Sequence, residues 1–399
     1  MEYIRLDKYC NAVKDGTHDT PKPVEEGMPL VTSKAINNNR IDFSQTYNIS
    51  QEDYQQINKR SLVQKWDILM TMIGSVGRLL LVQDEPRYAI KNIALFKIDD
   101  ELKSRWLYYY LSQRTIQDYF QAIANGTSQH FVPLKDLRRF KVASINDNSQ
   151  RIVSILSAYD SQIENNQKRI KLLEQMVENL YREWFVRFRF PGYENVEFEG
   201  GVPKGWKIEK LKQFITFYRG KSYSSDDIAS GNYVLLSMNN VRPWGGYIRD
   251  DSRVFGGAFK DFQLLQKGDL IMSITDMTQD RRIIGYVGIF DEERNDCVMS
   301  THLMKIVSEY NNYYLYGLFN FSLSRSISEY ATGANVLGLT DKILKEVKAL
   351  VPTNDLISVY GNTVRPFWEE IYHLKDEIAI LTHQRDLLLP RLMSGKLSI

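Results

Sequence analysis

Two stretches of this chain follow one sequence plan, and each ends in a long segment with heptad periodicity. Gly16 and Gly27 in the first stretch match Gly220 and Gly231 in the second, and both pairs have the same separation. Self-similarity over well more than a hundred residues predicts tandem copies of one domain.

Further matches extend the repeat along each copy. Lys65–Met70 matches Lys267–Met272, and Asn125–Leu137 matches Thr332–Leu344. The separation between matched segments drifts by a few residues, which indicates small insertions in loops. The chain is therefore expected to carry two related globular domains.

The heptad segments match best. Apolar residues alternate at four- and three-residue steps from Ile152 to Trp184 and again from Tyr360 to Leu392, with polar breaks at Asn166 and Arg385. Sustained 3.5-residue periodicity predicts a coiled-coil seam, and the intervening domain allows the second helix to return antiparallel to the first. The alternative is two amphipathic helices packed on separate domains. The expected seam residues are Ile152, Leu156, Ile163, Asn166, Ile170, Leu173, Leu180, Val364, Ile371, Leu374, Ile378, Leu381 and Leu388.

The expected fold class is α+β, with two pseudo-symmetric mixed α/β domains separated by two long antiparallel coiled-coil helices. Strands are expected at 79–82 and 93–98 and a helix at 105–124, while Pro366 should kink the last helix or delay its start and Pro390 should disturb its final turn. The expected boundaries are a first domain at 1–147, a central helix at 148–187, a glycine- and proline-rich linker at 188–206, a second domain at 207–353 and a C-terminal helix at 354–399.

Composition narrows the class of protein. The 399 residues are 43% hydrophobic and 25% charged, as in ordinary globular proteins. A net charge of +2 argues against indiscriminate coating of nucleic acid, although it permits a sequence reader with local basic loops. Cys10 and Cys297 suggest neither a disulfide nor a zinc site. The lack of a signal peptide or a membrane-length apolar run predicts a cytoplasmic protein.

The sequence contains no complete motif for catalysis or cofactor binding. Gly220-Lys221-Ser222 looks like the end of a phosphate-binding loop, but Ile215 stands where that loop needs a glycine. The chain has no dinucleotide fingerprint, no methyltransferase tetrapeptide of the Asn/Asp-Pro-Pro-aromatic type and no chelating histidine spacing. No carboxylate pair repeats in both copies. We therefore expect no catalytic residue, no metal site and no cofactor on this chain; a self-contained enzyme is the alternative and predicts cofactor binding by the isolated chain.

Several short segments along the chain carry a family resemblance. They are Asp15–Lys22, Asp67–Met70 with Ile73–Gly77, Gly126–Gln129, Val202–Trp206 and Leu387–Leu397. Taken together, they resemble the specificity subunit of type I restriction-modification enzymes, and the resemblance covers essentially the whole chain. Copy two departs from the pattern, because Ser273–Asp276 replaces the glycine turn of copy one and the Gly-Thr-Ser-Gln segment is missing.

The resemblance implies a non-catalytic subunit with two target recognition domains, each reading one half of a bipartite sequence in double-stranded DNA. Two modification subunits, which bind S-adenosylmethionine and methylate adenine N6, would dock on the helices. Restriction subunits would bring ATP and Mg. The helices would set the half-site spacing, with a seam of roughly 50 Å from Ile152 to Trp184.

Base reading in the major groove needs Arg, Lys, Asn or Gln side chains on loops, while phosphate contacts fix position. Equivalent polar loops occur in both copies, and Trp244 lies within the second one. The alternative for any one of these residues is that it lies on a solvated loop without a DNA contact. The alternative for the whole chain is a coiled-coil adaptor whose globular domains bind proteins. The candidate DNA contacts are Lys34, Asn37, Asn38, Arg40, Arg78, Ser128, Gln129 and His130 in copy one, and Lys221, Asn239, Asn240, Arg242, Arg281 and Arg282 in copy two.

Overall fold

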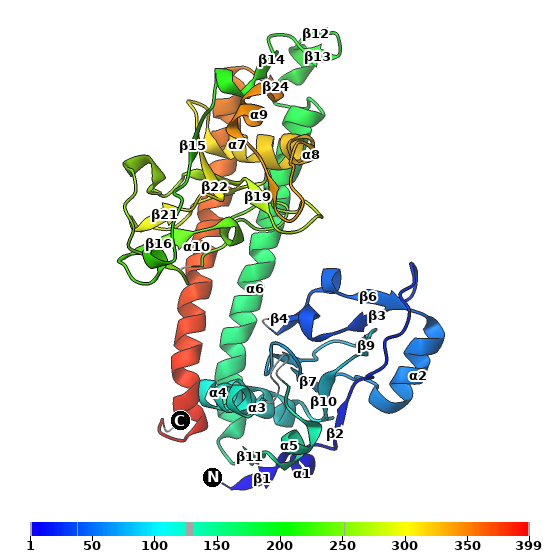
Figure 1. The fold of residues 1–399 in the computed structure, drawn as a ribbon. Coiled ribbons are helices and arrows are strands. Elements are labelled where there is room, and N and C mark those ends of the chain that lie inside the picture. The colour runs from blue at the N-terminus through cyan, green and yellow to red at the C-terminus, as the bar shows by residue number, and fades with distance from the viewer. Residues whose placement is uncertain (1, 38, 125–130, 251, 398–399) are drawn as a thin grey trace. The chain divides into compact units, whose positions relative to one another are not determined.

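The computed structural model describes residues 2–37, 39–124, 131–250 and 252–397 (Figure 1). The chain divides into two compact units, Met1–Asn165 with Ile378–Ile399 and Asn166–Glu377. Each unit contains one α+β domain and a portion of each of two long helices. These are α6 (Ser149–Tyr181), which continues as a π-helical turn over Arg182–Val186, and α10 (Asn354–Met393). The expected α+β class with two domains and two long helices is confirmed.

The first domain is built on a four-stranded antiparallel sheet and a smaller three-stranded one. The larger sheet has the order β2-β10-β7-β8 (Ala12–Asp15, Ile93–Lys97, Ile68–Thr71 and Leu79–Leu81). The smaller has the order β6-β3-β9 (Tyr47–Ile49, Met28–Val31 and Ala89–Ile90), with β3 and β9 parallel. Two further pairs are β1 (Tyr3–Arg5) with β11 (Lys141–Ala143) and β4 (Ile36–Asn37) with β5 (Arg40–Ile41).

Short helices cover these sheets. The single helix expected at 105–124 is wrong, because Gln113 adopts an extended backbone and separates two helices. Its side-chain Nε2 donates to the carbonyl of Tyr110 at 3.0 Å, so it ends the first helix by satisfying a terminal carbonyl. The helices are α1 (Leu6–Tyr9), α2 (Gln51–Ser61), α3 (Glu101–Ser112), α4 (Arg114–Ile123) and α5 (Leu134–Arg139), with 3₁₀ turns at Ser33–Ala35 and Phe43–Gln45.

The second domain repeats this plan. Its larger sheet has the order β15-β22-β18-β20 (Thr216–Arg219, Leu303–Val307, Leu270–Ser273 and Val287–Ile289), and its smaller sheet β17-β16-β21 (Val254–Phe255, Tyr233–Leu236 and Cys297–Met299) again holds one parallel pair, β16 with β21. The remaining pairs are β14 (Lys207–Lys210) with β24 (Lys348–Val351), β19 (Thr275–Asp276) with β23 (Leu337–Gly338), and β12 (Phe198–Glu199) with β13 (Val202–Pro203). The hairpin β12–β13 lies in the segment expected as a linker.

The helices of this domain are short. A continuous helical segment consists of α7 (Asn312–Gly317), a π-helical stretch at Leu318–Leu323 and α8 (Ser324–Glu329). The helix α9 spans Asp341–Glu346. Further 3₁₀ turns lie at Tyr193–Asn195, Leu211–Gln213, Asp226–Ile228, Met238–Asn240 and Asp261–Gln263.

The matched glycines occupy equivalent crowded positions. A Cβ atom on Gly16 would lie 2.3 Å from the carbonyl oxygen of Ile90, and one on Gly220 would lie 2.0 Å from that of Ser300. Each glycine also donates its N–H to the first residue of β10 or β22, at 2.9 Å for Gly16 and 3.0 Å for Gly220. Strand crossing at close range therefore explains why the repeat retains glycine at these two places.

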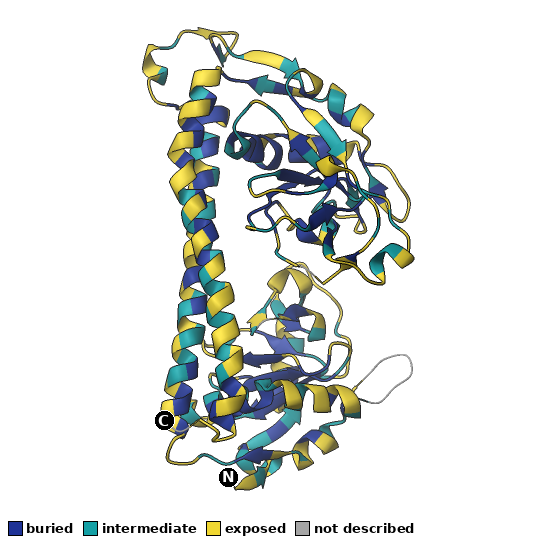
Figure 2. Cartoon of the chain, turned by 90° about the vertical axis from the view of Figure 1, so that its left-hand side faces the viewer, coloured by how far each residue is buried: buried dark blue, intermediate teal, exposed yellow. Residues whose placement is uncertain are grey.

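The long helices complete the core of each unit instead of forming a separate one. In the first unit Ile152 and Leu156 of α6 pack in one cluster with Leu389 and Leu392 of α10 and with Trp106 of the domain. The early part of α6 thus meets the late part of α10, so the helices are antiparallel there; their inner faces are buried in Figure 2.

The same holds in the second unit, where Val177 and Tyr181 of α6 share a cluster with Tyr360 and Val364 of α10. Among the expected seam residues, Ile152, Leu156, Ile163, Asn166, Val364, Ile371 and Leu374 are buried, and Ile170, Leu173, Leu180, Ile378, Leu381 and Leu388 are half-buried.

The prolines do not shorten α10. It begins at Asn354, as expected, and passes through Pro366 and Pro390, so of the two effects expected of Pro366 the late start is wrong. Both prolines face solvent, where water can hydrate the carbonyl that each leaves without an N–H donor. The buried Val364 and Trp368 hold the helix on either side of Pro366.

The polar break Arg385 joins three elements of the first unit. Its Nη1 donates to Asp160 of α6 at 2.7 Å, and the other oxygen of that carboxylate accepts the Tyr109 hydroxyl of α3 at 2.6 Å. Burial, together with the nearby Asp160 carboxylate, raises the pKa of Tyr109 and keeps its hydroxyl a donor. Arg385 therefore fixes the register of α10 against α6 in this unit.

We predict that Gly16→Ala and Gly220→Ala each lower the free energy of unfolding by about 1–3 kcal/mol, because the added methyl group must displace backbone. Denaturant unfolding followed by circular dichroism measures this. Gly338→Ala is the control, since its Cβ would meet only Thr332 at 3.9 Å and should cost less. Equal stability of all three variants would contradict the crowding that we infer at the two crossings.

Candidate nucleic-acid interface

In the first unit a short hairpin presents the polar residues that follow β3. Buried Ile36 pairs with Ile41 at its base, and Asn37 pairs with Arg40 near its tip. Lys34, Asn37 and Arg40 are exposed. Local pairing thus places these three side chains on one small projection; the predicted contact Asn38 lies outside the residues that the structure describes.

The turn between β7 and β8 lies against this hairpin. Arg78 donates through Nη1 to the carbonyl of Ile36 at 3.2 Å, and the N–H of Leu81 donates to Oδ1 of Asn39 at 2.8 Å. Thr71 organises the turn, because its hydroxyl donates to the carbonyl of Ser75 and accepts the N–H of Arg78 at 2.9 Å. The structure therefore brings Arg78 to the hairpin that carries Lys34, Asn37 and Arg40.

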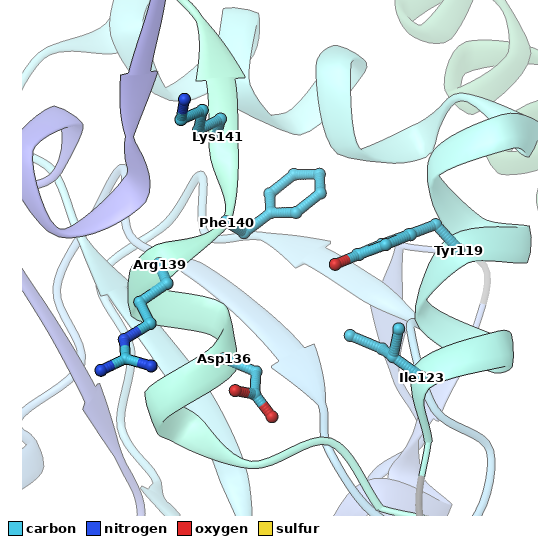
Figure 3. A pocket seen from close by; sticks show the side chains of 6 residues that line it. All are labelled: Tyr119, Ile123, Asp136, Arg139, Phe140 and Lys141. Atoms are coloured by element: carbon cyan, nitrogen blue, oxygen red, sulfur yellow. The ribbon is translucent and has the colours of Figure 1, made fainter.

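Three other predictions in the first unit, Ser128, Gln129 and His130, fall outside the described residues. The pocket nearest to them in sequence is lined by Tyr119 and Ile123 of α4, Asp136 and Arg139 of α5, Phe140 and Lys141 (Figure 3). The rings of Tyr119 and Phe140 pack at 5.4 Å between centroids. An open hollow with one carboxylate and two cations can bind a polar group, but it contains no nucleophile held by a base.

The second unit repeats the hairpin after β16. Val241 pairs with Tyr247, and Arg242 to Gly246 form the tip. Asn239 is exposed, but Asn240 is buried: its Oδ1 accepts the N–H of Ser237 at 2.8 Å and its Nδ2 donates to the carbonyls of Ile248 and Asp250 at 3.1 and 3.0 Å. The prediction of Asn240 as a DNA contact is wrong, because its buried amide forms the hydrogen bonds that close the loop.

Arg281 and Arg282 lie on the turn that adjoins this hairpin. The buried carboxylate of Asp276 shapes the turn by accepting the N–H of Thr278 at 2.7 Å and that of Ile283 at 3.1 Å. The carbonyl of Arg282 accepts the N–H of Trp244 at 2.9 Å. As in the first unit, the turn and the hairpin form one structure, and it carries Asn239, Trp244, Arg281 and Arg282.

Arg242, which was predicted to contact DNA, pairs with groups of this chain. Its Nη2 donates to Glu174 of α6 at 2.9 Å and its Nε to the carbonyl of Gly245 at 2.9 Å. Burial opposes the charge of this guanidinium, but the Glu174 carboxylate and Tyr316 together raise the pKa of Arg242. Arg242 thus ties the hairpin to α6, and we do not retain it as a base contact.

A second ionic tie joins the hairpin to α10. The side chain of Asp291 is wholly buried and accepts from Nε of Arg249 at 2.8 Å and from Nζ of Lys375 at 2.6 Å. Arg249 also reaches Asp376 at 2.6 Å, and Lys375 donates to the carbonyl of Tyr247 at 3.3 Å. Sequence analysis missed this network, because charged residues of these types are common along the chain and no spacing marks them.

Two arginines act on His302, whose ring lies beside β19. Burial, then Arg253 and Arg219, lowers the pKa of His302, whose Nδ1 lies 3.1 Å from the hydroxyl of Thr275. The last candidate, Lys221, is held through its backbone at the end of β15, by Met299 and Thr301 at 2.7 Å each. Its side chain therefore projects from the strand end that follows Gly220, not from the hairpin.

The arrangement of these side chains is better suited to binding a polyanion than to catalysing a reaction. In the part of the chain that the structure describes, no group of three or more His, Cys, Asp or Glu side chains could hold a metal ion. None of the helices described there has the length and apolarity to cross a membrane. What both units present is an exposed hairpin with amide and guanidinium donors braced by a neighbouring turn.

Comparison with known proteins agrees with this picture. The family model of the type I restriction modification DNA specificity domain matches residues 2–175 and 203–355. A type I restriction enzyme specificity subunit, MjaIX of Methanocaldococcus jannaschii, is 22% identical over 384 residues, covering 93% of this chain and 87% of the relative. The HindI specificity subunit of Haemophilus influenzae is 20% identical over 417 residues, with 85% and 88% covered.

Among solved structures, the S subunit of a type I restriction-modification system from M. genitalium has a similar fold. Its TM-score is 0.54 at 17% identity, and the alignment covers 98% of this chain and 95% of that one. The likeness thus extends over both domains and both long helices.

We predict that Asp291→Asn lowers the free energy of unfolding by about 3 kcal/mol, because it leaves Arg249 and Lys375 without a buried counter-charge. Thermal and denaturant unfolding measure the change. Asp376→Asn is the matched control: its carboxylate is exposed, and its loss should cost less than about 1 kcal/mol. A smaller loss for Asp291→Asn than for the control would refute the proposed tie.

Proposed function

The chain belongs to the type I restriction modification DNA specificity family, and from this premise we propose that each of its two domains reads one half of a bipartite target in double-stranded DNA. It is the DNA specificity subunit of a type I restriction-modification system and a non-catalytic component of that enzyme. The observation that carries the proposal is the pair of equivalent hairpins, one in each domain, each braced by a turn that bears arginine.

The side chains on these hairpins suit base edges. Arginine pairs with guanine through two donors and asparagine pairs with adenine through a donor and an acceptor, so a small projection with both types can read a few base pairs in the major groove. Asn37, Arg40 and Arg78 supply these groups in the first unit, and Asn239, Arg281 and Arg282 in the second. Lys34 and Lys221 supply charge for phosphates.

We further propose that the outer faces of the long helices receive two modification subunits. Leu172 and Met176 are exposed one turn apart on α6, and Ile380 and Leu387 are exposed two turns apart on α10. Exposed apolar pairs at helical spacing suit an amphipathic partner helix. The modification subunits would bring S-adenosylmethionine and methylate adenine N6, and restriction subunits would bring ATP and Mg.

The continuity of α6 and α10 supports the expectation that they set the spacing between the half-sites. Each helix runs from one unit into the other without a break in its helical backbone apart from the terminal π-helical turn of α6. A continuous helix has a fixed rise per residue, so the number of residues determines how far apart its ends lie.

We predict that co-expression of this chain with its modification subunits produces adenine methylation at one split motif, and that a control without this chain lacks the motif. Arg78→Ala should weaken the base preference in one half of the motif. The double change of Arg281 and Arg282 to Ala should weaken it in the other half, since each base contact contributes about 1–3 kcal/mol of discrimination. Long-read sequencing of methylated DNA measures both effects.

The matched controls are Arg114→Ala and Arg325→Ala, which remove almost fully exposed arginines of α4 and α8. They should leave the motif unchanged. An active complex with no chain-dependent motif would favour a protein-binding adaptor, and loss of bases in both halves from one variant would refute independent reading.

We predict that the double change of Leu172 and Met176 to Glu reduces co-purification of modification subunits at least tenfold without changing the unfolding midpoint, because charge on an apolar contact opposes docking. Size-exclusion chromatography of co-expressed subunits measures this. Ile208→Glu, at an exposed position on β14, is the control. Normal assembly of the double variant would exclude this face of α6.

A further inference from the structure

Trp244 combines two unfavourable features at the tip of the second hairpin. Its side chain is 61% exposed, and its backbone is left-handed with φ of 68°. Residues with bulky side chains rarely adopt this backbone conformation, whereas glycine and asparagine adopt it with little strain. Neither the burial of apolar surface nor the backbone preference explains a tryptophan at this place.

The loop holds Trp244 rigidly in this conformation. Its N–H donates to the carbonyl of Arg282 at 2.9 Å, and the N–H of Gly245 donates to that of Arg242 at the same distance. The side chain of Asn320 fills the space beside Gly245, where a Cβ would lie 2.6 Å away. The indole is therefore presented on a fixed platform, not on a freely moving loop.

Two arginines lie on the turn that holds Trp244, and the second of them, Arg282, pairs with Asp280 at 3.3 Å. Arg281 is also left-handed, with φ of 54°, and Arg282 is joined to Trp244 through the backbone. The indole edge meets the ring of Tyr286 at 5.7 Å and 89°, which leaves most of its surface open. Strained residues persist where the surrounding structure enforces them, and they cluster at binding sites.

The first unit supplies an instructive contrast. The left-handed residue at the tip of its hairpin is Asn39, with φ of 56°, and its side chain accepts a hydrogen bond from Leu81. There a residue suited to the conformation also braces the loop. Trp66 and Phe188 are also left-handed, but both pack against the cores of their units. In the second hairpin the left-handed tryptophan is exposed instead, so its indole is available to a ligand.

Building on the proposed function, we propose that Trp244 contacts bases, and that its indole packs against the 5-methyl group of a thymine in the half-site read by the second domain. The thymine methyl is the apolar feature that the major groove displays, and it is the group that a large apolar side chain recognises there. Arg281 and Arg282 beside it would bind phosphate or a guanine edge.

The first test uses Trp244→Gly in the assembled complex with modification subunits. Glycine adopts the left-handed conformation without strain, so the unfolding midpoint should stay equal or rise while cognate DNA binding weakens. Trp244→Phe should retain part of the binding, because it keeps an apolar ring. Phe198→Ala, which removes an exposed aromatic residue of β12, should change neither.

The second test removes the methyl group from the DNA. Duplexes carrying the mapped motif are made with deoxyuridine in place of each thymidine of the relevant half-site, and affinities are measured by fluorescence anisotropy. One such exchange should weaken the wild-type complex about fourfold, the effect of one buried methyl group. The Trp244→Gly complex should bind both duplexes alike.

Three results would overturn the inference. The half-site could contain no thymine, the exchange could weaken both complexes equally, or Trp244→Gly could lower the unfolding midpoint while binding cognate DNA normally, which would make the indole a structural cap. The absence of any chain-dependent motif with the wild-type chain would instead refute the proposed function, so the two failures are distinguishable.

Discussion

The apolar faces of the two long helices are buried in the cores of the domains, and the rest of the structure depends on this. In the first unit the helices meet the domain through Ile152, Leu156 and Leu392, and in the second through Tyr181 and Tyr360. Each domain would expose a large apolar surface without its share of α6 and α10. A domain of this kind cannot drift on its helices, so the position of its hairpin is set by core packing.

Ionic contacts refine that placement where packing alone does not select a direction. Arg385, Asp160 and Tyr109 fix the helix register in the first unit, whereas Asp291 and Glu174 tie the second hairpin to α10 and α6. Buried charges are costly unless paired, so these networks penalise alternative arrangements more than they add stability. The two copies therefore share a fold but use different residues to orient it.

The sequence alone predicted the features that repeat. The glycines at the strand crossings keep the same spacing in both copies, because no other residue fits there. The heptad positions also match between the copies, because only that period keeps one face of each helix apolar. It could not predict that Asn240 turns inward, that Arg242 pairs with Glu174, or that Gln113 divides a helix. Those outcomes depend on which backbone groups lie nearby after folding, and single side-chain types do not encode them. Trp244 was noticed in its loop, yet its left-handed backbone has no sequence signature.

We propose that each domain, once seated on the helices, reads its half-site by itself. The strands β1 and β11 close the first domain at residues 3–143 as β14 and β24 close the second at 207–351, so one can be substituted for the other. The most direct measurement is the methylation motif of a chain in which residues 3–143 also replace residues 207–351. Independent reading by each domain predicts a motif with two copies of the first half-site. Persistence of the second half-site, or a motif unrelated to either half, would contradict it.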